Sequence, residues 1–279
     1  MSKLIISFFL IFVLFNSCQK VPIDYHLVTP NLGARKILVE EFTGANCPNC
    51  PKGTDQIKNL VALYGENLIP MSIHAGGFAV KITNSKYDFV VPAGRDLLNL
   101  LTPPEGYPTA VINRKKFPNE TGLQLFLPSW AGYIQSESSI LPKIQIELTK
   151  KYNASTRGGT ITAQLTPLED INIPLKITFA ILENKIIDPQ KDNRVSGGHV
   201  DNYEHNHVLR AILTSSDGDP LGAQFTKDQN LDVTRTFQIP AQDGWWNDEN
   251  IEIIAFVTAH PLITNTMEVW QVERIKIKD

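Results

Sequence analysis

The sequence predicts two successive domains: an α/β domain at residues 35–139 and an all-β sandwich domain at residues 140–279. The first rests on residues 36–51 (KILVEEFTGANCPNCP), where an apolar run leads into a Cys-x-x-Cys pair and then a helical pattern. The second rests on a change in the residue pattern near residue 140: from there on, strand-like segments bounded by turn residues follow one another, and no helical periodicity is found. An apolar stretch at residues 4–15 indicates that the N-terminal segment belongs to neither domain.

The composition is that of a globular protein without a nucleic-acid partner. The chain has 279 residues, of which 42% are hydrophobic and 20% are charged, and its formal net charge is −3. Proteins that bind nucleic acid concentrate positive charge on one face, and this balance provides no such excess. We therefore expect no nucleic-acid partner, and the sequence predicts no cofactor.

The N-terminal segment is predicted to be an export signal followed by a tether. The apolar stretch at residues 4–15 is too short to span a bilayer, but it has the length of a signal-peptide core. Ser17-Cys18 comes soon after it, and a small residue directly before a cysteine resembles the bacterial lipoprotein signal. We therefore expect residues 1–17 to be a lipoprotein signal peptide, Cys18 to be lipidated and to hold the chain on a membrane, and residues 18–34 to be a tether. Ordinary signal cleavage is the alternative.

Residues 36–42 predict a central strand, because apolar side chains occur on both of its faces. Glu40 and Glu41 interrupt this run, so we expect at least one of the two carboxylates to point into covered space, unless the strand end frays into solvent. The helix that follows has apolar residues at helical spacing: Ile57, Leu60, Val61 and Tyr64. Counting back seven positions along this stripe reaches Cys50, which should be buried, whereas Cys47 should lie near the surface at the first turn.

The remainder of the first domain alternates strands and helices. The sequence predicts a strand at residues 68–73, a short helix near residues 93–101, a strand at residues 110–113 and a helix near residues 121–136 that Pro128 kinks or breaks. His74 follows the second of these strands. It either lies near the cysteine pair, where it would lower the pKa of the first thiol, or merely ends the strand.

The cysteine pair is expected to be reactive. The chain has three cysteines, and assigning Cys18 to the lipid leaves only Cys47 and Cys50, which form no disulfide framework. A bridge that closes so short a loop stabilises the fold little. A structural zinc site needs a second pair of ligands, and none is at hand in this domain, so we predict no metal. The N-terminal end of a helix favours a thiolate, which makes Cys47 the expected nucleophile and Cys50 the resolving thiol.

The order strand, Cys-x-x-Cys, helix, strand, helix, and then Gly106-Tyr107-Pro108-Thr109 at the start of a strand, resembles the thioredoxin superfamily. The resemblance implies a cis proline at Pro108 beside the dithiol, with Tyr107 helping to receive an extended substrate chain. It also implies a buried acid six residues before the first cysteine, which is Glu41 here and would accept the proton of the resolving thiol. Asn46 stands where thioredoxins commonly have tryptophan, so no redox potential is implied.

The second domain is predicted to be an antiparallel, immunoglobulin-like sandwich. Seven segments carry strand patterns: residues 143–152, 160–166, 174–182, 208–215, 231–239, 251–258 and 267–277. Between them, residues 197–207 contain three histidines (His199, His205 and His207) and two carboxylates, which suit a divalent metal, a polar loop or a contact with the first domain. Trp245-Trp246 either plugs the end of the sandwich or forms an exposed contact patch.

The whole chain resembles the Omp28-related outer membrane proteins of Bacteroidetes. The residues that carry this resemblance are residues 39–44 before Cys-Pro-Asn-Cys-Pro, residues 73–76, residues 106–108 and residues 205–210. It implies a lipidated protein of the bacterial cell envelope, at the outer membrane, with a thioredoxin-like domain before an all-β domain. We expect a thiol–disulfide oxidoreductase that acts on protein thiols and disulfides. Some members of that family are described as surface adhesins, so a non-enzymatic binding or adhesion protein is the alternative.

Overall fold

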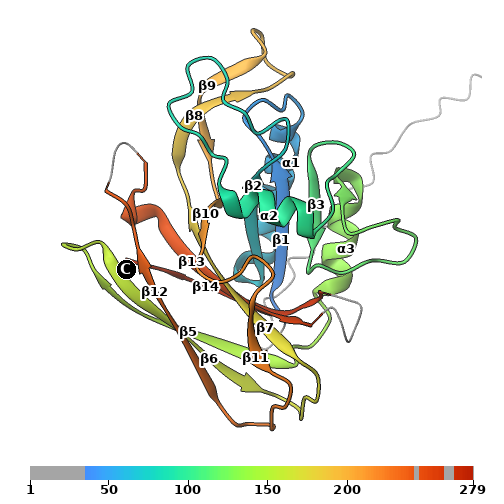
Figure 1. Ribbon diagram of the computed structural model, residues 1–279. Coiled ribbons are helices and arrows are strands. Elements are labelled where there is room, and N and C mark those ends of the chain that lie inside the picture. Colours follow the sequence, from blue (N-terminus) through green and yellow to red (C-terminus); the bar gives the residue numbers. More distant parts are fainter. Residues whose placement is uncertain (1–34, 242–244, 261–266, 279) are drawn as a thin grey trace, which may run out of the picture.

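The computed structural model describes residues 35–241, 245–260 and 267–278 (Figure 1). The predicted signal peptide, the tether and the lipidation site Cys18 lie outside the described residues. No helix within the described ranges is both long and apolar enough to cross a membrane. The fold is rich in β-structure and has few helices.

The first part of the chain, residues 35–139, forms the predicted strands and the first two predicted helices in the predicted order, and it adds one short strand, β4 (Leu125–Phe126). Its elements are β1 (Ile37–Thr43), α1 (Cys50–Tyr64), η1 (Gly65–Asn67), β2 (Leu68–His74), α2 (Pro92–Leu100), β3 (Thr109–Ile112), β4, η2 (Leu127–Ser129) and α3 (Trp130–Glu137). The long helix predicted near residues 121–136 is broken at Pro128, as expected, but the piece before the break is not helical. Leu125 and Phe126 instead pair with β3.

Strand β1 lies inside the sheet. It runs parallel to β2, with Ile37 opposite Leu68, and antiparallel to β3, with Val39 opposite Ile112. All seven residues of β1 and all seven of β2 are buried, because helices cover both faces of the sheet. Helices α1 and α3 pack on one face, and α2 packs on the other.

In the second part of the chain, the regular structure of the described residues from 140 to 278 is almost entirely β-structure. It contains β5 (Ile144–Asn153), β6 (Gly158–Pro167), β7 (Leu175–Glu183), β8 (Ile186–Lys191), β9 (His199–His205), β10 (Val208–Ile212), β11 (Asp219–Gly222), β12 (Leu231–Gln238), η3 (Asp248–Asn250), β13 (Ile251–Ala259) and β14 (Val269–Lys276). All seven predicted strands are present. Three more, β8, β9 and β11, were not predicted, because β8 contains Pro189 at an irregularity and β9 is mostly exposed and polar.

One sheet joins the two parts of the chain. Its strand order is β14-β13-β7-β10-β2-β1-β3-β4, with β11 on the edge of β7. The link is β10, which runs parallel to β2 at Val208 and Ser72 and antiparallel to β7. Near residue 140 the sequence pattern changes from alternating strands and helices to strands alone. The sheet itself continues across this point, because strands from both parts of the chain belong to it.

The sandwich is unequal. A three-stranded sheet, β12-β6-β5, packs through apolar side chains onto β7 and β13 of the nine-stranded sheet (Figure 1). The remaining pair, β8 and β9, forms a separate hairpin. This hairpin lies at the end of the molecule where α1 begins.

Candidate dithiol site

The two cysteines lie at the point where β1 ends and α1 begins. A disulfide joins Cys47 to Cys50, whose Cα atoms are 5.4 Å apart. The turn is held by two backbone hydrogen bonds, from Cys47 N to Gly44 O (3.0 Å) and from Cys50 N to Cys47 O (3.3 Å). Pro51 fits the first turn of α1, where a backbone N–H has no partner inside the helix.

Both cysteines are buried. Cys50 is 1% exposed, as the helical phase predicted, but Cys47 is only 2% exposed. The expectation that Cys47 lies near the surface is therefore wrong. The helical phase applies only from Cys50, where α1 begins, and Cys47 precedes it. The β8–β9 hairpin, a distant segment, contacts the loop that carries Cys47.

That hairpin supplies hydrogen-bond donors to the dithiol loop, residues 44–49. Lys191 N donates to Ala45 O (2.9 Å), and Asn193 N donates to Pro48 O (3.0 Å). The buried side chain of Gln190 donates from Nε2 to Gly44 O (3.1 Å) and to Cys47 O (3.0 Å). The hairpin thus donates hydrogen bonds to backbone carbonyl groups of the dithiol loop. A substrate chain that replaced the hairpin would have to supply donors to the same groups.

The tip of the hairpin is held by more exposed contacts. Asn193 Nδ2 donates to Asn49 Oδ1 (2.7 Å), and Arg194 Nη1 lies 2.6 Å from Asp55 Oδ2 on α1. The Arg194 and Asp55 side chains are 39% and 58% exposed. Ion pairs so exposed contribute little, typically below ~1 kcal/mol. The hairpin is therefore bound firmly at Gln190 and weakly at its tip.

Glu41 is a buried acid below the first turn of α1. Its side chain is 1% exposed, Oε2 accepts a hydrogen bond from Ser72 Oγ (3.1 Å), and Oε1 has no hydrogen-bond partner. Burial raises the pKa of the Glu41 carboxyl to about 7, and the hydrogen bond from Ser72 offsets only part of that rise. A proton can therefore be gained or lost there near neutral pH.

Gly53 marks the place where Glu41, α1 and Pro108 meet. A Cβ atom at position 53 would lie 2.8 Å from Glu41 Oε1 and 2.9 Å from Pro108 Cβ, closer than Cβ contacts in proteins come. Gly53 follows Cys50 by three residues, so the acid and the proline both lie against the first turn of the helix that carries the cysteines.

The peptide bond between Tyr107 and Pro108 is cis, as predicted. Pro108 directly precedes β3, and the Tyr107 hydroxyl donates to Ala75 O (2.9 Å) beyond the end of β2. The Tyr107 ring also contacts Phe78, with centroids 5.5 Å apart. Tyr107 is half-buried and braces the loop that follows β2.

His74 packs as a buried aromatic residue. Its ring centroid lies 4.6 Å from that of Phe89 and 5.6 Å from that of His205. Burial holds the pKa of His74 well below its ordinary value, with a smaller contribution from His205, and burial lowers the pKa of His205 to about 4. Both imidazoles are neutral at pH 7, so His74 brings no positive charge that would stabilise a thiolate.

The three histidines of residues 197–207 point to different surroundings. His199 is exposed beside Asp201, His205 is buried against Phe89, and His207 contacts Glu252. Among the described residues no group of three or more His, Cys, Asp or Glu side chains is placed to hold a metal. Residues 199–205 are β9, so this run supplies one strand of the cover over the dithiol.

Trp245 and Trp246 pack on one arginine. The Arg210 guanidinium lies 3.7 Å from the ring centroid of Trp245 and 3.9 Å from that of Trp246, and Arg210 also pairs with the buried Glu183. Trp245 stacks on Tyr87 at 4.9 Å. The pair does not form an exposed patch: Trp246 packs against the sandwich core, as a plug at its end would, whereas Trp245 packs against Tyr87 and Phe89 of the first part of the chain.

A cavity of about 330 Å³ runs between α1 and β9 and reaches Glu41. Ser72, Thr54 and Tyr203 line it with Glu41. Burial raises the pKa of Tyr203 to about 12, so its hydroxyl remains protonated at neutral pH. Sequence reasoning missed Gln190, Asn193 and Tyr203, because hydrogen bonds to backbone carbonyls and packing against another element leave no periodic pattern in the sequence.

Residues 103–279 match the model of the outer membrane protein Omp28 family. This match covers more than half of the chain. The chain belongs to the Omp28 family. Membership places it in the bacterial cell envelope, at the outer membrane. The matched part of this Omp28 protein includes Tyr107-Pro108 and the β8–β9 hairpin, and it begins after the two cysteines.

Two solved structures share the fold. HBP35 of Porphyromonas gingivalis is similar with a TM-score of 0.69 and 19% sequence identity, over 88% of this chain and 76% of that one. Protein AGR_C_4864 from Agrobacterium tumefaciens is similar with a TM-score of 0.53 and 10% identity, over 88% of this chain and 96% of that one. Identities this low show similarity of fold alone. No curated protein matches the sequence significantly.

Proposed function

We propose that this Omp28 family member is a thiol–disulfide oxidoreductase of the bacterial envelope, with a thioredoxin-like first part and an immunoglobulin-like sandwich in the second. The observation that carries the proposal is the meeting of three groups at the first turn of α1: the Cys47–Cys50 disulfide, the buried acid Glu41 and the cis proline Pro108. The pairing of β1 with a parallel β2 and an antiparallel β3 supports the thioredoxin-like assignment.

The reaction transfers two electrons. In the reducing direction, the Cys47 thiolate attacks a substrate disulfide, forms a mixed disulfide and expels one substrate thiolate. Cys50 then loses its proton to the Glu41 carboxylate and attacks the Cys47 sulfur, which expels the second substrate thiolate. The substrate disulfide is reduced to two thiols, and the dithiol is oxidised to the disulfide found here. The oxidising direction is the reverse, and a pKa of about 7 suits Glu41 to either one.

Substrate access requires the β8–β9 hairpin to move. Both cysteines are almost fully buried, and the carbonyl groups of Gly44, Ala45 and Cys47 already accept hydrogen bonds from the hairpin. We propose that the hairpin opens from its exposed tip and that an extended substrate chain then replaces it on these carbonyls. Pro108 and Tyr107 would flank that chain.

The proposed anchor is a lipid on Cys18. It is supported by the apolar residues 4–15 and by the Ser17-Cys18 junction. Cells that produce the full chain or its Cys18→Ser variant would be separated into membrane and soluble fractions. The full chain should remain with the membranes and carry the mass of a lipid-modified cysteine. Recovery of both forms in the same fraction with unmodified masses would contradict the anchor.

The burial of both cysteines is also compatible with a second, non-enzymatic function. The cover over the dithiol also suits a binding or adhesion protein in which Cys47–Cys50 is a structural disulfide and no reaction occurs. Its partner would contact another surface of the molecule.

Insulin reduction with dithiothreitol, and oxidation of a reduced peptide, separate the two functions. Wild type, Cys47→Ser and Gln190→Ala would be compared, because Gln190→Ala loosens the cover while the dithiol is retained. The oxidoreductase proposal predicts activity in wild type, more in Gln190→Ala and none in Cys47→Ser. Equal inertness of all three proteins across the redox buffers would leave the binding function.

A further inference from the structure

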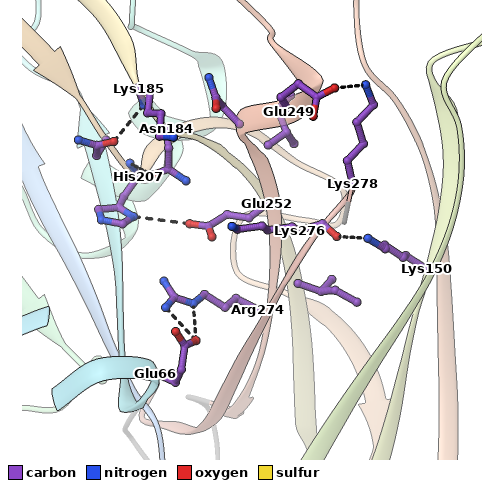
Figure 2. A pocket seen from close by; sticks show the side chains of 14 residues that line it. Glu66, Lys150, Asn184, Lys185, His207, Glu249, Glu252, Arg274, Lys276 and Lys278 are labelled. Carbon is purple, nitrogen blue, oxygen red and sulfur yellow. Dashed lines mark hydrogen bonds and ion pairs between the residues drawn. The ribbon is translucent and has the colours of Figure 1, made fainter. Parts of the chain in front are cut away.

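A second cavity, of about 620 Å³, lies away from the dithiol (Figure 2). It is formed where the β7–β8 and β9–β10 turns face the start of β13 and the end of β14, and Glu66 of η1 contributes one wall. Its volume falls within the range of about 300–1,000 Å³ that is usual for small-molecule sites. Nothing in the proposed oxidoreductase reaction uses it.

The cavity is more positive than the rest of the molecule. Five cationic side chains and three carboxylates line it, in a chain whose net charge is −3. Some of these charges are paired: Arg274 lies 2.9 Å from Glu66, and Lys278 lies 2.6 Å from Glu249. Lys185 and Lys276 are exposed at the rim and form no ion pair with any residue that the structure describes. The unpaired charge is therefore available to an anionic group.

The cavity is also lined by a buried carboxylate, one oxygen of which has no hydrogen-bond partner among the described residues. The Glu252 side chain is 6% exposed, and its Oε1 atom has no hydrogen-bond partner within the described residues. His207 Nδ1 is 3.5 Å away, beyond ordinary hydrogen-bond length, and it also lacks a hydrogen bond. Burial raises the pKa of Glu252, but the neighbouring His207, Arg274 and Asn184 side chains together lower it by more, so the carboxyl is ionised at neutral pH.

The unpaired lysines at the rim and the unsatisfied Glu252 oxygen together indicate which kind of ligand would fit. A simple anion would pair with the rim lysines but would leave Glu252 Oε1 without a donor, and a neutral polyol would do the opposite. We propose that the cavity binds a sugar acid, whose hydroxyl groups donate to Glu252 and whose carboxylate is held by Lys276 and Lys185. Figure 2 shows the His207, Glu252, Lys276 and Arg274 side chains directed toward the same space. A free monosaccharide and the terminal residue of an acidic glycan present the same chemistry.

Isothermal titration calorimetry of the purified chain at pH 7 tests the two-part requirement. Glucuronate and galacturonate carry both groups, glucose carries only the hydroxyls, and inorganic phosphate carries only the charge. We expect at least one of the two sugar acids to bind about tenfold or more tightly than glucose and phosphate, as the loss of one charge-assisted contact implies. A short oligogalacturonide tests the polymer source: tighter binding than galacturonate would indicate a glycan end, and equal or weaker binding a free monosaccharide. Failure of both sugar acids to exceed glucose and phosphate would overturn the proposal.

Substitutions of lining residues test whether the sugar acid binds in this cavity. Lys276→Gln should weaken sugar-acid binding about tenfold, whereas Lys151→Gln, an exposed lysine of β5 outside the cavity, should leave it unchanged. Glu252→Gln should weaken binding as well, with thermal unfolding measured to confirm that the variant folds. Equal affinity of the Lys276→Gln and Lys151→Gln proteins would refute the site. Insulin reduction measured on the same samples separates this result from the fate of the oxidoreductase proposal, because Lys276 takes no part in the dithiol reaction.

Discussion

Replacing Glu41 with glutamine tests whether a buried, proton-exchanging acid lies under the dithiol. The structure raises the pKa of Glu41 from 4.5 to about 7, chiefly through burial. The folded protein therefore retains a proton that the unfolded chain has already lost between these two pH values. Stability due to this group should fall as the pH rises from 4.5 to 7 and then level off.

The size of the effect follows from the same two values. One pH unit corresponds to ~1.4 kcal/mol, so a rise from 4.5 to about 7 makes the folded protein about 3 kcal/mol less stable at pH 8 than at pH 4. Glutamine is neutral at every pH and nearly isosteric, so Glu41→Gln should abolish this loss. The variant should gain stability relative to wild type as the pH increases, by an amount that approaches about 3 kcal/mol.

Urea unfolding followed by tryptophan fluorescence at pH 5, 6, 7 and 8 measures this difference directly. Glu147→Gln is the matched control, because Glu147 is an exposed glutamate on β5. The difference in unfolding free energy between wild type and Glu41→Gln should change with pH, while that for Glu147→Gln should not. A Glu41→Gln difference that stays constant from pH 5 to pH 8 would refute the reasoning.

Three further predictions concern the same site. The rate of insulin reduction by wild type should rise with pH through about 7, because Glu41 becomes ionised in that range. Above that pH, Glu41→Gln should be slower than wild type by a factor of about 100 or more. A wild-type pH profile without an inflection near 7 would contradict the role of Glu41. Gly53→Ala should lower the melting temperature, at a cost of ~1–3 kcal/mol, because the new methyl group would lie 2.9 Å from the rigid ring of Pro108; an unchanged melting temperature would argue against this packing. Gln190→Ala should speed alkylation of the reduced dithiol by iodoacetamide roughly tenfold, because two buried hydrogen bonds are lost. Asp55→Asn removes only the exposed ion pair with Arg194, which keeps its pair with Asp192, and should have a smaller effect; equal rates in the two variants would show that the cover is not held at Gln190.

Local features of the site were predictable because each depends on residues close together in the chain. The spacing of Cys47 and Cys50 and the helical stripe that continues from Cys50 are set by the geometry of a single helix turn. The cis bond before Pro108 was expected from the resemblance to the thioredoxin superfamily, and it is compatible with proline, which tolerates that geometry far better than other residues. Both carboxylates of the first strand are buried, Glu40 against Arg114 and Glu41 against Ser72, since a strand covered on two faces leaves neither side chain in water.

Other features depended on contacts between distant segments. Two interpretations of His74 were open in the sequence. The structure favours the one in which His74 merely ends its strand, because it is the last residue of β2 and its ring is enclosed by Phe89 and His205, which leaves it neutral. The same holds for Trp245-Trp246, whose rings pack on Arg210 and do not form an exposed patch. In each case the partner is far away along the chain, and its identity carries no periodic signal.

The sequence by itself determined the cysteine spacing, the burial of Cys50 and the order of the main strands and helices around the cysteines, because short-range geometry and hydrophobic periodicity specify them. The acid Glu41 and the cis proline Pro108 followed from the resemblance to the thioredoxin superfamily. The tertiary structure alone decided that β10 joins β2 in one continuous sheet, and that the β8–β9 hairpin contacts the loop that carries Cys47. Both depend on backbone hydrogen bonds, such as that from Lys191 N to Ala45 O. Every residue except proline offers the same backbone donor and acceptor, so side-chain sequence does not specify which segments will pair across the fold.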